Sequence, residues 1–239
     1  MRENETVLRH LSQAVNPVLL VLLLGADFAF LLLHIFNKFS SMPNVLFNLS
    51  NDDGYSEMFQ YIKEYWIAIV LFAMYWRTRE GIYGAWALLF TYALCDDALG
   101  FHEQVGRVVV SHWNYAPALG LRAQDFGELT VSVAVGSAFL ILITYFYLRC
   151  SNNAKNVSED LVLLFGLLVF FGVFVDAVNS LVDGLTMVEE SGEMVTISLI
   201  TSYVVRLLER QEHVAGSLWQ LAKGSPRFFK KPLPSSWHI

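Results

Sequence analysis

The chain has 239 residues, of which 55% are hydrophobic and 16% are charged, and its mean hydropathy is +0.45. This composition indicates an integral membrane protein rather than a water-soluble domain. The formal net charge is −6 and the basic residues are spread over short loops and a tail, so no nucleic-acid partner is expected.

Six apolar segments approach the roughly 20 residues that a bilayer core of about 30 Å demands of a spanning helix. In chain order they cover 17–36, 60–76, 81–104, 125–148, 160–184 and 187–208. The sequence therefore predicts an all-α bundle of about six transmembrane helices. We expect 1–208 to form one membrane domain and 209–239 to form a basic cytoplasmic tail.

The first segment follows Arg2 and Arg9, as the apolar part of a secretory signal would. It is nevertheless long, contains Asp27 and lacks a small-x-small cleavage site, so we expect it to remain as a membrane anchor. Threading six spans from a cytoplasmic N-terminus places 12 of the 16 lysines and arginines in the cytoplasm. The four on the outer side are Lys38, Lys63, Arg107 and Arg122. Both termini are therefore expected in the cytoplasm.

Carboxylates gather where the chain is otherwise most apolar, and such residues are costly in a bilayer. The group consists of Asp96, Asp97, His102, Glu103, Asp125, Glu128, Asp176, Asp183, Glu189, Glu190 and Glu193. Asp96, Asp176 and Glu190 lie at a similar depth, roughly 24 to 26 Å from the inner ends of their helices. Asp96 and Glu103 are expected on one face of a continuous helix, seven residues apart. We expect four helices to turn such acidic faces inward, at the extracytoplasmic end.

These carboxylates cannot all be ionised in a low-dielectric site with only Arg107 and Arg122 nearby. Bound metal, shared protons, a cationic substrate or a water-filled vestibule would neutralise them. A bound divalent metal is the most specific of these interpretations, since carboxylates three or four residues apart on several helices hold metals in other helical bundles. Oxygen ligands favour Mg, Ca, Mn or Fe. The expected metal ligands are Asp96, Asp97, His102, Glu103, Glu128, Asp176, Glu190 and Glu193.

Three functions remain open. In a metal-dependent membrane enzyme, the metal would activate water or polarise a lipid substrate, with Asp97 or Glu190 as the catalytic general acid or base. In a cation or proton transporter, Asp27 would act as a relay, since it stands alone near the middle of the first span. In a structural or assembly subunit, the acidic residues would be solvated in an outer vestibule.

Two short motifs carry a family resemblance. Asp96-Asp97-Ala98-Leu99-Gly100-Phe101-His102-Glu103 and Glu189-Glu190-Ser191-Gly192-Glu193-Met194 resemble the acidic-acidic, His-Glu and Glu-Glu-x-x-Glu motifs of uncharacterised polytopic bacterial membrane proteins. The resemblance implies a multi-pass protein of the bacterial inner membrane with a shared site, and it implies no particular chemistry. Membrane hydrolases of the alkaline ceramidase type use several histidines that this sequence lacks.

Overall fold

The protein is represented by a computed structural model that describes residues 14–51, 54–117, 122–179 and 185–222. Within these ranges the chain forms helices and no strand. The elements are α2 (Pro17–Lys38), the 3-10 turn η1 (Val45–Phe47), α3 (Tyr55–Thr78), α4 (Gly81–Leu99), α5 (Phe101–Trp113), α6 (Ala123–Tyr147), α7 (Asn152–Val169), the π-helical η2 (Phe170–Val175), α8 (Asp176–Asn179) and α9 (Thr186–Ala222).

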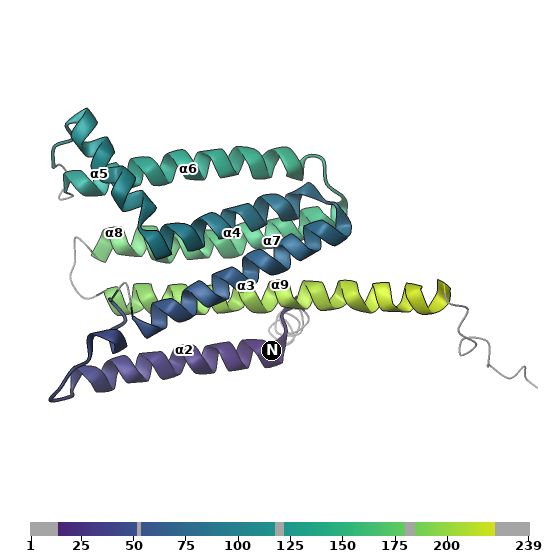
Figure 1. The fold of residues 1–239 in the computed structure, drawn as a ribbon, viewed down its shortest axis with the longest axis horizontal. Helices are drawn as coiled ribbons and strands as arrows, with labels where there is room; N and C mark the ends of the chain where they lie inside the picture. Colours follow the sequence, from purple (N-terminus) through teal and green to yellow (C-terminus); the bar gives the residue numbers. More distant parts are fainter. Residues whose placement is uncertain (1–13, 52–53, 118–121, 180–184, 223–239) are drawn as a thin grey trace, which may run out of the picture.

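Figure 1 shows the long helices running roughly along one axis in alternating directions, with the shorter α5 at one end. The start of α2 lies beside the middle of α9 (Figure 1), where the backbone N–H of Asn16 donates to the carbonyl of Ser202 at 3.2 Å. The Asn16 side chain also caps α2, accepting from the backbone N–H of Leu19 at 3.0 Å, and Pro17 begins the helix.

Three helical segments are long and apolar enough to cross a membrane: α2, α6, and α7 together with η2. In α3, α4 and α9, polar residues such as Lys63, Asp96 and Glu193 interrupt the apolar run. The sequence therefore anticipated the helical elements, while only part of the expected six spans meets the criteria of length and hydropathy.

Several expected boundaries are wrong. The segment 81–104 is not one helix, because Gly100 takes a left-handed conformation (φ 58°) that ends α4 and lets α5 start in a new direction. Asp96 and Glu103 therefore do not share the face of one helix. The fifth helix begins at Asn152 rather than at 160. The last helix, α9, extends into the segment expected as a tail, to Ala222.

A buried apolar core joins α3, α4, α7 and α9. It fills the end of the bundle where α3 ends and α4 begins. Its fully buried members include Ile67, Leu71, Met74, Ile82, Trp86, Phe90, Leu161, Ile200 and Val204. The indole of Trp86 donates to the Ser158 hydroxyl at 2.9 Å, so the one polar atom of that ring is satisfied. This core is apolar apart from a few buried hydroxyl groups, such as those of Ser158 and Thr201.

At the other end, α5 and α6 approach each other backbone to backbone. A β-carbon at Gly127 would lie 2.5 Å from the carbonyl oxygen of Gly106 and 2.6 Å from a methyl group of Val110. Only glycine fits this contact, because any side chain at position 127 would overlap main-chain atoms.

Candidate functional site

A buried ion pair joins α2 to α3. The ammonium nitrogen of Lys63 lies 2.9 Å from Oδ1 of Asp27, and the two side chains are only 0% and 5% exposed. Lys63 also donates to the carbonyl of Met194 at 3.0 Å and to the Ser198 hydroxyl at 3.2 Å, both on α9. The Ser198 hydroxyl donates in turn to Oδ2 of Asp27 at 2.5 Å. All three N–H groups of the ammonium have acceptors, so this network is neutral and complete.

The structure adds two facts to the expectations for these residues. Asp27, which is alone near the middle of its own helix, has a partner on α3, and Lys63, which the sequence places on the outer side, is buried. A lysine and an aspartate in helices that pack together gain more from pairing than from separate exposure to lipid.

Next to this pair, Glu64 carries a buried carboxyl group. The residue is 1% exposed, and its side chain forms a hydrogen bond with the carboxyl group of Asp97 on α4. Such a bond requires a proton on one of the two carboxyl groups. Glu193 on α9 also acts electrostatically on Glu64. These three acids form an inner cluster next to the Lys63–Asp27 pair.

Glu193 reaches this cluster past a π-helical turn. Its Oε1 atom occupies the space that a β-carbon at Gly172 of η2 would fill. On the same stretch, the ring of Phe171 packs onto Gly192 in the same manner. Single π-helical turns within α-helices are frequent at functional sites, and here the turn brings a glycine opposite a carboxylate.

This contact leads to a matched pair of glycine substitutions. We expect Gly172→Ala to displace the Glu193 carboxylate from the inner cluster and to lower the unfolding temperature, because the new methyl group takes the carboxylate's place. Gly166→Ala on α7 serves as the control, since nothing lies within 4 Å of a β-carbon there. Thermal unfolding of the two purified variants would show a loss for Gly172→Ala alone; equal behaviour would contradict the role of this contact.

A second group of residues forms where α4, α5 and α6 meet. Both carboxylate oxygens of Asp96 hold His102: Oδ1 accepts from its backbone N–H at 2.8 Å, and Oδ2 lies 3.1 Å from Nδ1 of its ring. The left-handed conformation of Gly100 turns the chain between Asp96 and His102, where α4 ends and α5 begins. Asp96 thus stabilises the start of α5 as well as orienting the imidazole.

The remaining acids of this outer group have close partners at the surface. Gln124 donates to Oε1 of Glu128 at 2.7 Å and to the carbonyl of Glu103 at 3.1 Å. Glu103 also lies 3.6 Å from Arg107, in an exposed pair. Exposed pairs of this kind contribute little to stability, typically about 0–1 kcal/mol. Asp125 is held in the same way by Arg122, at 2.7 Å.

The structure therefore divides the expected single site in two. Asp97 and Glu193 belong to the inner cluster, and Asp96, His102, Glu103 and Glu128 belong to the outer group. Glu190 is half-buried on α9. The Asp176 side chain and the whole of Asp183 lie outside the part that the structure describes. Among the described residues, no three His, Cys, Asp or Glu side chains converge as a metal ion would require.

Sequence reasoning missed Gln60, Lys63 and Glu64. A usable signal existed, because Lys63 and Glu64 stand inside the predicted span 60–76, where charged residues are expensive and usually functional.

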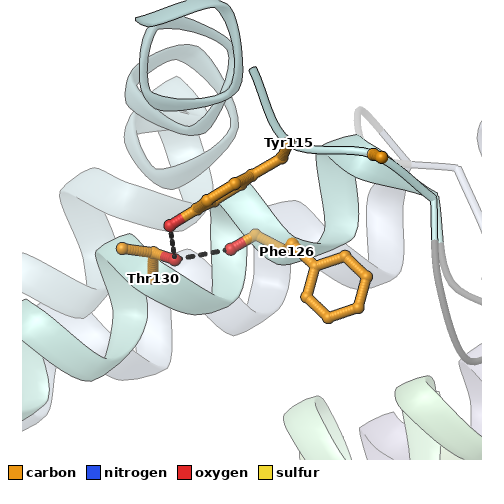
Figure 2. Close-up of a pocket in the computed structure, with 4 residues that line it drawn as sticks. Tyr115, Phe126 and Thr130 are labelled. Carbon is orange, nitrogen blue, oxygen red and sulfur yellow. Dashed lines mark hydrogen bonds between the residues drawn. The ribbon is translucent and has the colours of Figure 1, made fainter. Parts of the chain in front are cut away.

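A small open pocket lies at the junction of the loop after α5 with α6, lined by Tyr115, Ala116, Phe126 and Thr130 (Figure 2). The hydroxyl groups of Tyr115 and Thr130 lie 3.3 Å apart, and Thr130 donates to the carbonyl of Phe126 at 2.7 Å. These polar atoms satisfy one another, so the pocket lacks groups directed at a ligand.

Comparison with known proteins identifies the family of this chain. No curated protein and no solved structure matches the chain. A family model described as a domain of unknown function, DUF8692, matches residues 11–207, which include the inner cluster and the outer group. The protein therefore belongs to the DUF8692 family.

Proposed function

We propose that the protein is a multi-pass membrane protein with six spans, formed by α2, α3, α4, α6, the α7 to α8 segment and α9. The alternating direction of these helices supports this arrangement (Figure 1). The distribution of lysine and arginine supports cytoplasmic termini. The outer group would then face the extracytoplasmic side of a bacterial inner membrane, as the resemblance of the two acidic motifs suggests.

Its function in this proposal is transport of a cation or proton through the inner cluster. The observation that carries the proposal is the hydrogen bond between the carboxyl groups of Glu64 and Asp97, beside a lysine that is already neutralised. Such a pair holds a proton that another positive charge can replace. Intramembrane carboxylates of this kind mark ion pathways and proton relays in many transporters.

Access to the cluster is one-sided. Asp97 is exposed at the end of α4, whereas the apolar core around Leu71, Trp86 and Ile200 separates Glu64 from the opposite end. A carrier with this arrangement takes up its ion from one side and releases it only after the core opens, as in rocking transporters. In this proposal Asp27 anchors the helices and does not relay protons, because both of its oxygens are engaged.

A second candidate, the metal-dependent membrane enzyme, is favoured by the Asp96–His102 pair. Metal-binding histidines are commonly oriented by a carboxylate on the other ring nitrogen. Mg, Ca, Mn or Fe bound at Nε2 of His102 would need Glu128 and further oxygen ligands, with a lipid as the substrate. This candidate ranks second because the described side chains do not converge on one metal position.

A flux assay tests the transporter. Liposomes containing the protein and a pH-sensitive dye would receive a gradient of sodium, potassium or magnesium salt. We expect at least one gradient to drive proton movement, and Glu64→Gln to reduce it to the rate of protein-free liposomes, because an amide cannot release a proton. Glu159→Gln is the matched control, since Glu159 is exposed and accepts only from the Tyr147 hydroxyl. Full flux in Glu64→Gln would refute the proposal.

A further inference from the structure

Two buried side-chain oxygen atoms on α3, one in the inner cluster and one on the neighbouring turn, lack partners among the described residues. Oε1 of Gln60 and Oε2 of Glu64 have no hydrogen bond to any described residue, although these residues are only 5% and 1% exposed. Leaving such an atom buried and unsatisfied costs about 1–3 kcal/mol. The residues are four apart on α3, so their side chains share one face of the helix.

The surroundings of these atoms are rich in oxygen and poor in cationic partners. Glu193 and Asp97 both act on Glu64, and Glu193 lies against the π-helical turn. Lys63 stands beside Glu64 in the sequence, but its three N–H groups are already engaged. Oxygen-only surroundings are typical of hard cations, and transporters bind coupling ions where a helix is interrupted.

The charge of the cluster indicates the valence of the ion. A monovalent cation that replaces the proton shared by Glu64 and Asp97 leaves the buried charge unchanged. The described side chains also lack the three converging His, Cys, Asp or Glu ligands of a divalent site.

We infer that Gln60 and Glu64 bind a monovalent metal cation, sodium or potassium, in competition with the proton of the Glu64–Asp97 pair. The inference deepens the proposed function by naming the ion that would be exchanged for protons. The charged groups that face the exchange are Lys63 and, through it, Asp27, then Glu193, and the Asp96–His102 pair next to Asp97.

The test uses the full chain in detergent, in a weakly buffered solution. Sodium, potassium or choline chloride is added at equal ionic strength while released protons and the thermal unfolding temperature are measured. We expect sodium or potassium to release about one proton per occupied site and to raise the unfolding temperature by about 2–4 °C. Choline should do neither, because it cannot enter a site built from two side-chain oxygens.

Two variants and one control sharpen the test. Gln60→Leu should abolish the cation-specific shift by removing one ligand, and Glu64→Gln should abolish both the shift and the proton release. Glu159→Gln should retain both. Equal effects of sodium, potassium and choline on the wild type would show that water occupies the two oxygens, and would overturn the inference.

The two proposals fail in distinguishable ways. Cation-specific proton release without flux in liposomes would refute transport and leave the binding site intact. Proton flux in choline salts alone, without any cation-specific effect in detergent, would refute the monovalent site and leave proton transport intact.

Discussion

Replacing Lys63 with methionine is expected to destabilise the protein by about 3–5 kcal/mol, the cost of removing one partner from a buried ion pair. Methionine fills a similar volume, so the loss comes mainly from the Asp27 carboxylate, which would remain buried without its ammonium. The Ser198 hydroxyl and the Met194 carbonyl would also lose a partner. For a chain of this size the unfolding temperature should fall by about 6–20 °C, as measured by tryptophan fluorescence in detergent.

The matched control is Lys155→Met at the start of α7, where the ammonium lies over the ring of Tyr147, 5.6 Å from its centre. Its effect should stay within about 0.5 kcal/mol, as is usual for surface substitutions. The double variant Asp27→Leu with Lys63→Met should recover part of the loss, because an apolar pair needs no compensation. If Lys63→Met behaved like the control, the buried pair would not exist as described.

Gly127→Ala should cost about 1–3 kcal/mol or more, because the added methyl group overlaps the carbonyl oxygen of Gly106. A backbone atom cannot rotate away as a side chain does, so α5 would have to move off α6 and the bridge from Gln124 to Glu103 would break. Thermal unfolding of the purified variant measures the loss.

Gly136→Ala on the same helix is the control, since a β-carbon there meets nothing within 4 Å. Its unfolding temperature should stay the same or rise slightly, as alanine favours the helix over glycine. Equal losses in the two variants would mean that helix propensity, and not the contact between α5 and α6, determines the effect.

The helices could be predicted from sequence wherever a single uninterrupted apolar run covers most of the helix. The run 125–148 corresponds closely to α6, and 17–36 to most of α2. The break at Gly100 could not be predicted, because the spacing of Asp96 and Glu103 fits one continuous helix as well as two. What separates the cases is a backbone angle at one glycine, and glycine is also tolerated inside helices.

The site could be predicted only in part, for a related reason. Asp97 and Glu193 were recognised because each lies in a conspicuous acidic motif. Their interaction with Glu64 was missed, since nothing in local spacing shows that residues 33 or more positions apart will meet. Asp27 was recognised as unusual, yet its partner lies on another helix. Periodicity identifies the face of a helix, and only packing identifies the neighbour.

The Lys63 network also sets an order for biogenesis. In the proposed membrane arrangement, Asp27 would enter the bilayer in the first helix, where an unpaired charge costs about 2.5–3.5 kcal/mol, and Lys63 would follow 36 residues later. The Ser198 hydroxyl lies a further 135 residues along the chain, about 7–27 s of synthesis. The Lys63 ammonium would therefore lack its two acceptors on α9 until the last helix has been made. A chain whose synthesis stops before α9 would lack the Met194 and Ser198 acceptors, so two N–H groups of the Lys63 ammonium would have no partner there.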